Sequence, residues 1–527
     1  LIAALLICCS TCPAGLGADR DELARRILAE TGVRGGLIVH VGCGDGRLTA
    51  ALRAGEPYVA QGLDVDETNV EEARSHIDSL GIYGPVTVRR FDGRRLPYVD
   101  DLVNLVVSED PGEVSMEEVL RVLAPGGVAY LKKGGVWERI DNPWPEEIDE
   151  WTHWLHDASG NPVARDTKVG PPREMQWFAE PLWSRSHEKS PSLTGMVTAK
   201  GRLFYIADEA PVSVGGSLPD KWRLVARDAL SGVLLWKRPV ADWGWKAWSP
   251  AQPMNLRWGN PRFIHRRLVA IEDRVYVTIG YGAPVTALDA ATGERIRVYE
   301  GTENTSEIVY HEGLLLLSVA TEAKDSIKSA PTLKIQAIQA ATGERLWETG
   351  PFASLYDLGE RGKSNVLKQG RLMIAAEGDR VFAVTEADIR AFHLGDGKPA
   401  WSVPRPAAVL PGGAGKAADK KVRAAVGKMF TNLGSIMVHD GRVFYTQPHV
   451  PTGKLVNNVP MTLLCVSAET GEENWRRICG DWSYTTNLNV YAIRDLIWVH
   501  EDRRNGPYDL LKLNPETGEV ELRYDLA

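Results

Sequence analysis

The sequence contains few cysteines, no surplus of basic residues and no apolar run long enough to cross a membrane. Of its 527 residues only 6 are cysteine, and three of these lie in the first twelve positions. The other three, Cys43, Cys465 and Cys479, are too few for a disulfide framework. With 61 Lys and Arg against 69 Asp and Glu, the net charge is −8, which argues against a dedicated nucleic-acid or anionic-membrane binder.

Low-complexity segments are also absent, which excludes a disordered or collagen-like chain. A hydrophobic fraction of 44% and a charged fraction of 25% are ordinary for soluble globular proteins, and the length indicates two or more domains. The 17 Trp exceed the 15 Tyr and the 9 Phe, and their spacing becomes informative in the second half of the chain.

The beginning of the chain is typical of an exported protein. Leu1 to Leu6 is apolar, small residues follow as far as Ala18, and charge starts at Asp19. An apolar stretch followed by small residues is similar to the end of a secretory signal peptide. We therefore predict a signal-peptide remnant over residues 1–18 and a location in the periplasm or cell envelope, with an artefactual N-terminus as the alternative.

Two of the remaining cysteines fall on one predicted hairpin. Cys465 and Cys479 flank a turn near Thr470-Gly471, which places them roughly opposite each other on the two strands. A disulfide can form there in an oxidising compartment. Two buried free thiols are the alternative, and the sequence does not choose between them.

Strands and helices alternate along residues 20–140. Helical patterns cover 21–30, 47–52, 68–80 and 116–123, and apolar strand patterns cover 36–41, 58–63, 86–91, 102–107 and 128–131. This alternation predicts a parallel, doubly wound α/β sheet. The first strand runs into the turn Gly42-Cys43-Gly44-Asp45-Gly46, which lets backbone N–H groups approach a ligand closely. Asp64 ends the second strand, where a carboxylate can accept hydrogen bonds from both ribose hydroxyls of an adenosine-containing ligand.

Three segments of this region resemble motifs of class I S-adenosylmethionine-dependent methyltransferases: VGCGDGRLTAAL, DGRRLPYVDDLVNLVVSED and LRVLAPGGVAYL. The resemblance implies a Rossmann-like methyltransferase fold over residues 20–140 with S-adenosylmethionine as its cofactor. It implies that Gly42, Gly44 and Gly46 lie against the methionine part of the cofactor, that Asp64 binds the ribose and that Asp92 binds the adenine amino group. Cys43 in the first segment and Glu109 at the end of the second complete the implied cofactor-binding residues.

The sequence departs from this family's pattern in two places. His40, two residues before Gly42, stands where the family usually has an acid. After Leu131 the last two strands of the family fold, which often shape the acceptor site, are not recognisable. No catalytic residue can be named, because methyl transfer needs mainly proximity and alignment. A working methyltransferase and a vestigial cofactor-binding domain both remain open, and we favour the enzyme.

Residues 141–194 form a predicted connector that contains one metal-like motif. His153, His156 and Asp157 make an H-x-x-H-D cluster, and on a helix the two imidazoles would share a face and could ligate one metal. Trp151 and Trp154 interleave with them, a pattern more often found in an aromatic packing seam. We predict packing and no metal site.

Residues 195–527 repeat one signature six times, in which a Gly follows an apolar segment and a Trp often stands four residues later. Glycine spacings of 47 to 74 residues leave room for about four strands per repeat, as in a propeller blade. The Gly accepts the positive φ of a hairpin turn, and we predict that the Trp docks between neighbouring blades. The glycines are Gly232, Gly293, Gly343, Gly397, Gly471 and Gly518, and the tryptophans are Trp236, Trp347, Trp401 and Trp475.

This repeat resembles the tryptophan-docking repeat of the pyrroloquinoline-quinone (PQQ) propeller superfamily, which holds quinoprotein alcohol dehydrogenases and cofactor-free relatives. The resemblance implies a PQQ-like β-propeller. Relatives usually close with eight blades, so six visible blades indicate a chain that is incomplete at its C-terminus. The dehydrogenases use a vicinal disulfide and Ca²⁺, whereas the only vicinal cysteines here are Cys8-Cys9 in the leader. No calcium-ligand motif is recognisable, so we expect neither PQQ nor Ca²⁺.

Taken together, the two resemblances predict an S-adenosylmethionine-binding, methyltransferase-like protein whose propeller recognises a protein or cell-envelope partner. One alternative is a non-catalytic envelope scaffold with a vestigial methyltransferase domain. A second alternative is a PQQ-dependent dehydrogenase.

Overall fold

The chain divides into two compact units. The computed structural model describes residues 14–170, 175–180, 193–211, 219–244, 264–321, 332–353, 355–356, 370–405, 435–448, 459–482, 489–501 and 509–525. The first unit comprises Leu1–Ile148, Lys168–Ala179 and Ala226–Lys237, and the second comprises Asp149–Thr167, Glu180–Val225 and Arg238–Ala527. The predicted signal-peptide remnant and Cys8, Cys9 and Cys12 lie almost wholly outside the described residues, which begin with the helix α1 (Ala14–Thr31).

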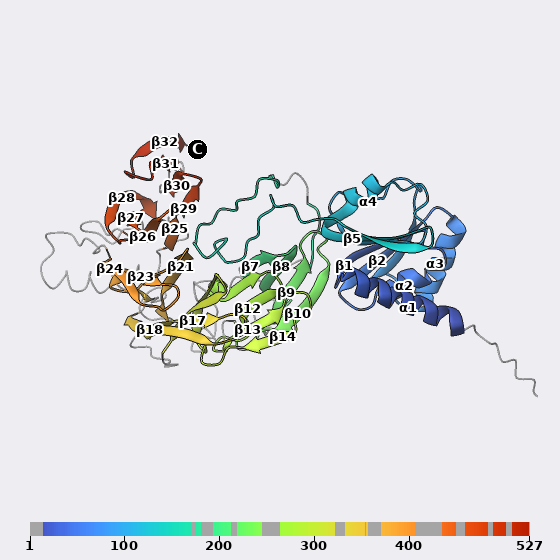
Figure 1. Cartoon of the computed structure of the whole chain (residues 1–527), viewed down its shortest axis with the longest axis horizontal. Helices are drawn as coiled ribbons and strands as arrows, with labels where there is room; N and C mark the ends of the chain where they lie inside the picture. Colours follow the sequence, from blue (N-terminus) through green and yellow to red (C-terminus); the bar gives the residue numbers. More distant parts are fainter. Residues whose placement is uncertain are drawn as a thin grey trace, which may run out of the picture. The chain divides into compact units, whose positions relative to one another are not determined.

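The first unit is built on a six-stranded sheet in the order β3-β2-β1-β4-β5-β6 (Figure 1). The first five strands pair in parallel, and β6 is antiparallel to β5. This confirms the predicted Rossmann-like fold. The strand order reverses between β1 and β4, and ligands of open α/β sheets bind beyond the carboxyl ends of the strands at such a switch point. The strands are β1 (Gly36–Val41), β2 (Tyr58–Asp64), β3 (Val86–Arg90), β4 (Val103–Ser108), β5 (Leu123–Lys133) and β6 (Val136–Asp141).

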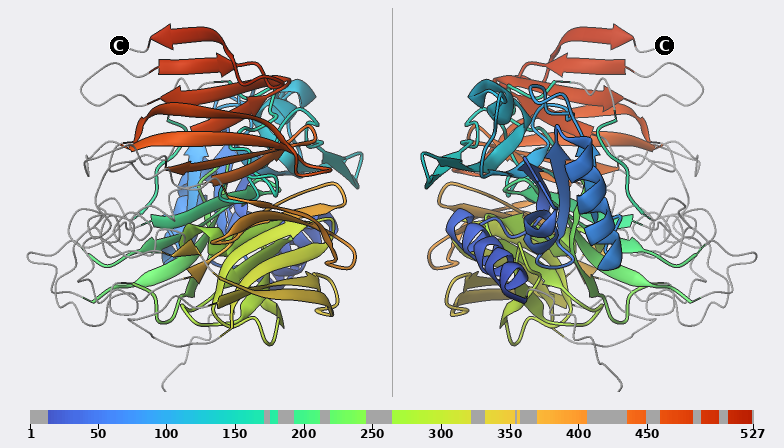
Figure 2. Two further views of the ribbon diagram at one scale, coloured as in Figure 1. Left: turned by 90° about the vertical axis from the view of Figure 1, so that its left-hand side faces the viewer. Right: turned by 90° about the vertical axis from the view of Figure 1, so that its right-hand side faces the viewer.

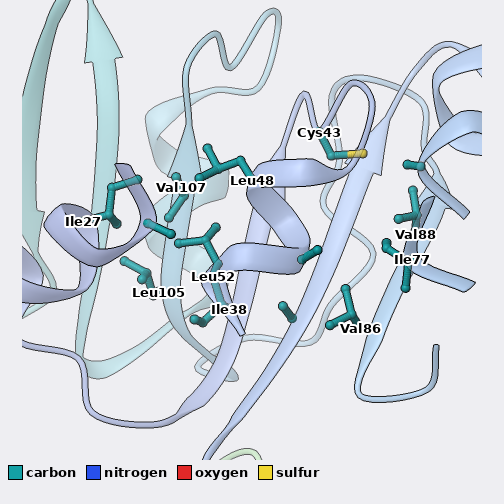
Figure 3. Close-up of a cluster of buried hydrophobic side chains, with 14 of the residues drawn as sticks. Ile27, Ile38, Cys43, Leu48, Leu52, Ile77, Val86, Val88, Leu105 and Val107 are labelled. Atoms are coloured by element: carbon teal, nitrogen blue, oxygen red, sulfur yellow. The ribbon is translucent and has the colours of Figure 1, made fainter. Parts of the chain in front are cut away.

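Three further helices, α2 (Arg47–Leu52), α3 (Glu67–Ser79) and α4 (Met116–Val122), follow strands of this sheet. Asp66 caps α3 by accepting a hydrogen bond from the backbone N–H of Thr68, and Ser115 caps α4 in the same way. One apolar cluster joins α1, α2 and α3 to the sheet. Figure 3 shows Leu48 and Leu52 of α2 in this cluster with Ile27 of α1.

The strand β6 was not expected from the sequence. It follows β5 through Gly134 and Gly135, whose φ values of 56° and 86° suit a two-residue hairpin turn. Most of its residues are partly or fully exposed, so it lacks the apolar alternation that would have predicted a strand. β6 pairs with β5, after which no further strand of the methyltransferase fold was recognisable in the sequence.

Six four-stranded sheets follow, each built from strands consecutive in the chain (Figure 2). This confirms the six predicted blades of a PQQ-like propeller. Blade 1 holds β7 (Leu193–Ala199), β8 (Arg202–Asp208), β9 (Trp222–Asp228) and β10 (Leu234–Pro239); blade 2 holds β11 (Leu268–Ile271), β12 (Arg274–Thr278), β13 (Val285–Asp289) and β14 (Arg295–Val298); blade 3 holds β15 (Thr305–His311), β16 (Leu314–Ala320), β17 (Thr332–Gln339) and β18 (Arg345–Ala353); blade 4 holds β21 (Met373–Glu377), β22 (Arg380–Val384), β23 (Asp388–His393) and β24 (Pro399–Pro404); blade 5 holds β25 (Ser435–His439), β26 (Arg442–Pro448), β27 (Val459–Ser467) and β28 (Glu473–Trp482); blade 6 holds β29 (Asn489–Ile493), β30 (Leu496–Glu501), β31 (Asp509–Leu513) and β32 (Val520–Asp525).

The predicted docking of tryptophan between blades is confirmed for Trp347, Trp401 and Trp475 and has one repeated geometry. Trp347 of blade 3 donates from Nε1 to the carbonyl of Leu394 at 2.8 Å, and its ring covers Gly397 of blade 4. Gly397 has φ 67°, and a Cβ there would lie 2.6 Å from the Trp347 ring. The same arrangement recurs for Trp401 with Ala468 and Gly471, and for Trp475 with Pro515 and Gly518. In each case the accepting carbonyl stands three residues before the glycine.

Two further aromatic residues make the same hydrogen bond outside the predicted tryptophan positions, and of these two only Trp177 also covers its glycine. Tyr299 follows β14 and donates from its hydroxyl to the carbonyl of Ala340 at 2.6 Å, three residues before Gly343. Trp177, in the predicted connector, donates to the carbonyl of Ala229 at 3.0 Å and covers Gly232. The sequence signal that could have found both is an aromatic residue well before the next signature glycine, 44 residues for Tyr299 and 55 residues for Trp177.

The segment Trp151–Asn161, hereafter the inner segment, hydrogen-bonds the first strand of all six blades in order. These strands gather at one edge of the array, since β7 contacts β11, β11 contacts β15, β15 contacts β21 and β21 contacts β25. The inner segment thus lies where a propeller has its central channel. The accepting and donating atoms are Trp151 O and Thr198 N (2.7 Å), Thr152 O and Ala270 N (3.0 Å), His153 Nε2 and Tyr310 N (2.9 Å), Ala158 O and Ala376 N (2.9 Å), Ser159 O and Val438 N (2.9 Å), and Asn161 Oδ1 and Ala492 N (3.1 Å).

The cysteines of blade 5 do not face each other. The hairpin forms as predicted, but Cys465 pairs with Trp475 and Cys479 pairs with Met461 across the two strands. Both cysteines are buried and neither is in a disulfide bond, so the disulfide alternative is wrong. The turn and a β-bulge between Cys465 and Val466 offset the two strands, so the two cysteines are not opposite each other as their positions in the sequence had indicated.

Among the described residues, no helix is long and apolar enough to cross a membrane.

Candidate functional site

The glycine loop after β1 contains three glycines in the left-handed region, and their surroundings differ. Gly42, Gly44 and Gly46 have φ values of 72°, 50° and 74°. A Cβ on Gly44 would meet no atom within 4 Å, so this residue borders open space. A Cβ on Gly42 would lie 3.1 Å from the carbonyl of Asp110, which brings the loops after β1 and β4 together.

Gly46 and Cys43 face the interior of the domain. A Cβ on Gly46 would lie 2.6 Å from the Cβ of Ala73, so this glycine allows α2 to pack on α3. The Cys43 thiol is buried in the apolar cluster of Figure 3, and burial raises its pKa to about 12. The backbone of Cys43, and not its thiol, therefore belongs to the surface of the loop.

Asp64 anchors the glycine loop from the end of β2. Its side chain is 5% exposed, and its Oδ2 accepts a hydrogen bond from the backbone N–H of Gly44 at 2.9 Å. Its Oδ1 accepts from the N–H of Asp66 at 3.0 Å and from Asn69 Nδ2 at 3.2 Å. The structure thus brings Asp64 and Gly44 together and fixes the direction of the carboxylate.

Asp92 lies on the loop after β3 and is exposed. Its Oδ1 accepts hydrogen bonds from the backbone N–H groups of Arg94 (2.9 Å) and Arg95 (2.8 Å). These two bonds hold the pKa of Asp92 below its usual range. Both β2 and β3 end at the same edge of the sheet, because they are adjacent and parallel. Asp92 therefore stands at the edge that also carries Asp64.

Glu109 follows directly after β4, the strand that pairs with β1. β1 and β4 are paired with Val41 opposite Ser108, so Glu109 comes next to the start of the loop. Arg20 of α1 donates to its Oε2 at 2.6 Å, and Lys132 Nζ of β5 lies 3.7 Å from its Oε1. Arg20 was not identified from the sequence, because a single basic residue in an amphipathic helix does not indicate a functional site until the position of the helix in the fold is known.

His40 is a neutral residue within the core. Its Nδ1 is hydrogen-bonded to Thr49 Oγ1 at 2.8 Å, and its side chain is 2% exposed. Burial lowers its pKa to about 4, so the imidazole carries no charge at pH 7. The position that usually supplies an acid in class I methyltransferases is thus uncharged here, whereas a carboxylate, Glu109, follows the neighbouring strand β4.

The H-x-x-H-D cluster is not helical, so the prediction that its imidazoles could share a helix face is wrong. His153 and His156 instead form an isolated bridge. His153 accepts from the N–H of Tyr310 at 2.9 Å, whereas His156 Nε2 is 2.7 Å from Asp149 Oδ2. Each imidazole therefore serves the packing of the inner segment. Within the described parts of the chain, no group of three or more His, Cys, Asp or Glu side chains could hold a metal ion.

Comparison with known families identifies both parts of the chain. Residues 38–127 match the family model described as "Methyltransferase domain". Residues 179–475, more than half of the chain, match the model described as "Outer membrane protein assembly factor BamB", a model of PQQ-like repeats. The chain belongs to this PQQ-like repeat family. The predicted fusion of a methyltransferase domain to a PQQ-like propeller is thereby confirmed.

Two curated proteins similar to part of this PQQ-like repeat protein are methyltransferases. "Ribosomal RNA small subunit methyltransferase C" of Klebsiella pneumoniae is 30% identical over 130 residues, which are 23% of this chain and 36% of that protein. "Methyltransferase GfsG" of Streptomyces halstedii is 32% identical over 114 residues, which are 20% of this chain and 40% of that protein. The chain thus spans well under half the length of the relatives it matches.

Two solved structures serve as examples of those similar to part of this PQQ-like repeat protein. A SAM-dependent methyltransferase from Aquifex aeolicus is 24% identical, covers 25% of this chain and 80% of its own, and superposes with a TM-score of 0.20. An S-adenosyl-L-methionine-dependent methyltransferase from Methanococcus maripaludis is 23% identical, covers 22% of this chain and 57% of its own, and superposes with a TM-score of 0.21.

Proposed function

We propose that the N-terminal domain binds S-adenosylmethionine at the carboxyl ends of β1, β2 and β4 and transfers its methyl group to an acceptor. The single observation that carries this proposal is the pairing of Asp64 with Gly44. A buried carboxylate at the end of β2 holds a loop whose central glycine borders open space. The residues present fit the cofactor, because a loop with left-handed glycines and a fixed acid suits an adenosine-containing ligand.

Each candidate residue has a role in this proposal that follows from its position. Gly42 and Gly44 would contact the methionine part, Asp64 the ribose and Asp92 the adenine amino group. Gly46 and the Cys43 thiol would act indirectly, since they pack α2 and the loop against the core. The bound cofactor supplies an electrophilic methyl group, and the protein's part is to orient it and exclude water.

The proposal is tested by calorimetric titration of the full chain with S-adenosylhomocysteine. We expect binding by the wild type and its loss in Asp64→Ala, because both the anchor of the loop and the ribose acceptor disappear. Asp78→Asn, an exposed carboxylate near the end of α3, is the matched control and should bind normally. Absence of binding by a folded wild-type sample at millimolar ligand would favour the vestigial alternative.

We propose further that the propeller recognises a protein or cell-envelope partner and that the chain acts after export. Membership of a PQQ-like repeat family supports a binding role. The inner segment supports it as well, because it lies along the first strands of the blades, where a propeller has its central channel. Partner recognition would then use the outer loops and faces of the blades.

Two assays separate these propeller roles. A dye-linked alcohol oxidation assay with added PQQ and Ca²⁺ should give no activity, whereas activity would support the dehydrogenase alternative. Export is tested by fractionating cells that express the full chain with a C-terminal tag. Recovery in the periplasmic or envelope fraction is the expected result, and recovery in the cytoplasm alone would contradict export.

A further inference from the structure

The inner segment contains a tight turn at a histidine that lies between two carboxylates. His156 is buried, with a side chain that is 3% exposed. Its Nε2 lies 2.7 Å from Oδ2 of Asp149, just before the inner segment, and its Nδ1 lies 3.4 Å from Oδ2 of Asp157. The imidazole therefore connects the chain before the turn to the chain after it.

The two contacts of His156 together need an imidazole with two protons. A neutral imidazole has one N–H and one lone pair, so it can donate to one carboxylate only, and its lone pair then faces the other carboxylate. The imidazolium ion has an N–H on each nitrogen and can serve both carboxylates. The position of His156 between Asp149 and Asp157 thus favours the charged form.

Both carboxylates are also held by donors other than the histidine. Asp157 Oδ1 accepts from the backbone N–H of Ser159 at 2.9 Å, and its Oδ2 accepts from the Arg165 guanidinium at 3.1 Å. Asp149 Oδ2 accepts from the backbone N–H of Arg165 at 2.6 Å. Burial favours the protonated carboxyl groups, but the surrounding donors outweigh burial and hold the pKa of Asp149 and of Asp157 below the usual range. Both acids therefore keep their charge at neutral and alkaline pH.

The other titratable groups that face this turn have partners of their own. His153 accepts from the N–H of Tyr310 at 2.9 Å, and burial lowers its pKa to about 4, so it is neutral at pH 7. Arg266 and Glu307 line a small pocket beside the turn and pair with each other at 2.6 Å. Burial also opposes a charge on His156, but its two carboxylate neighbours outweigh burial and raise its pKa above the usual 6.5.

The backbone of the turn is in a conformation that needs support. His156 has a φ of 68°, in the left-handed region, which a residue other than glycine keeps only where the surrounding contacts hold it. The carbonyl of His156 accepts from the N–H of His153 and from Thr152 Oγ1, both at 3.0 Å. The turn thus also positions Thr152 and His153, which hydrogen-bond blades 2 and 3.

We propose that His156 is a pH-sensitive latch, which holds the inner segment on the blades while both ring nitrogens carry a proton and loosens it when one proton leaves. The Nδ1 proton passes to solvent, and the remaining lone pair then faces the charged Asp157 carboxylate. The turn loses one of its two ties, and the inner segment separates more often from the first strands of the blades. The central channel of the propeller is therefore closed at low pH and accessible at high pH.

The direction of this pH dependence follows from the raised pKa. A group whose pKa is higher in the folded state contributes stability that is complete below its unfolded value of 6.5 and is lost as the pH rises through the folded value. The latch therefore holds below pH 6.5 and is released at a pH above it. His40, whose pKa is lowered, has the opposite effect, and it acts on the acid side of pH 6.5.

Hydrogen exchange of the full chain at several pH values tests the latch. The amides of Ala270, Ala376 and Val438 donate to carbonyls of the inner segment, so their protection shows whether the segment is in place. Their protection factors, which are corrected for the effect of pH on intrinsic exchange, should fall about tenfold or more from about pH 6 to about pH 9, the usual effect of losing a charged hydrogen bond. Protection within β13 and β17 should stay unchanged, because the blades remain folded.

Two variants change the latch in opposite ways. His156→Asn cannot titrate, so the three amides should show low protection at every pH. Asp157→Asn offers an amide N–H to the neutral imidazole, so the three amides should stay protected up to about pH 9. His76→Asn is the matched control, since His76 lies on α3 of the first unit, and it should reproduce the wild-type profile.

Each outcome decides for or against the latch. A wild-type profile that does not fall above pH 6.5 would overturn it, as would a fall of wild-type size in His156→Asn. If circular dichroism shows that His156→Asn does not fold, Asp157→Asn decides: sustained protection at high pH supports the latch, and a fall equal to that of the wild type overturns it. A simultaneous loss of protection in β13 and β17 would indicate global unfolding in place of local release and would overturn it as well.

Discussion

At the scale of single residues, positions that look equivalent in the sequence have different structural roles. The motif G-x-G-x-G presents Gly42, Gly44 and Gly46 as one set, yet Gly44 borders open space and Gly46 packs on Ala73. The need for glycine is common to all three, because each has a positive φ. What lies beside each glycine depends on how α2 and α3 pack, which the loop sequence does not contain.

This difference predicts unequal effects of alanine at the two positions. Gly44→Ala should cost about 1–2 kcal/mol from the left-handed backbone alone. Gly46→Ala should cost about 1–3 kcal/mol more, because its Cβ would lie 2.6 Å from that of Ala73 and α2 would have to move. Urea unfolding measures the free energies, and calorimetry should show that Gly44→Ala nevertheless weakens S-adenosylhomocysteine binding more. Equal destabilisation by both would contradict this account of the loop.

His40 gives the protein a predictable pH dependence. Its pKa is about 4 in the folded state, against 6.5 for an unperturbed histidine. Between these values the unfolded state binds more protons, so stability is complete above pH 6.5 and falls as the pH drops toward 4. The loss should reach about 3 kcal/mol at pH 4, from roughly 1.4 kcal/mol for each pH unit.

The His40 contribution is isolated by comparing the free energy of unfolding against pH in the wild type and in His40→Asn. The variant should be less stable at pH 7, because the contact with Thr49 is altered, but its stability should fall less steeply between pH 6.5 and 4. His153, whose pKa is also lowered to about 4 by burial, remains in both proteins and contributes to the pH dependence of stability that is left in the variant. Identical slopes would show that His40 does not titrate as described.

At the scale of elements, the blade signature combines a turn and an interface in about ten residues. The glycine forms the hairpin turn, and at Gly397, Gly471 and Gly518 the tryptophan of the preceding blade covers that same glycine. A Cβ on Gly397, Gly471 or Gly518 would lie within 2.5–2.6 Å of the docked ring. Tyr299 makes the equivalent hydrogen bond to the carbonyl of Ala340, whereas Gly343 is covered by Arg297, so this hydrogen bond does not require tryptophan.

Two glycines of blade 4 provide a direct test of the docking geometry. Gly397→Ala should destabilise the protein by about 2–4 kcal/mol, because it combines a left-handed φ with overlap on the Trp347 ring. Gly395→Ala, two residues earlier in the same turn, should cost less than about 0.5 kcal/mol, since its Cβ would meet no atom within 4 Å. Thermal unfolding of the two variants gives the comparison, and a larger loss for Gly395→Ala would contradict it.

At the scale of the whole molecule, the inner segment ties together blades that are far apart in the sequence. Asn161 makes two hydrogen bonds with the backbone of Ala492, 331 residues away, through Nδ2 (2.9 Å) and Oδ1 (3.1 Å). Its amide side chain thus pairs with β29 as a strand would. The predicted connector is therefore a structural part of the second unit over Asp149–Thr167.

Replacing Asn161 should loosen the last blade more than the others. Asn161→Ala leaves the N–H and C=O of Ala492 without this partner, which should cost about 1–3 kcal/mol. Hydrogen exchange should then accelerate in β29–β32, whereas β7–β10 should keep their protection. Arg165→Ala, at a side chain that is 78% exposed, is the control and should leave both regions unchanged. Uniform acceleration across all blades would indicate that the inner segment does not act blade by blade.

Local patterns in the chain already specify the elements and the repeat. Apolar alternation and glycine position mark β1 and α2 at their observed bounds, and glycine spacing gives six blades, because these features depend on residues near one another in sequence. Long-range packing decides the rest. The register of Cys465, the fold of the H-x-x-H-D segment and the meeting of Arg20 with Glu109 each depend on partners brought close by the complete fold, which no local pattern contains.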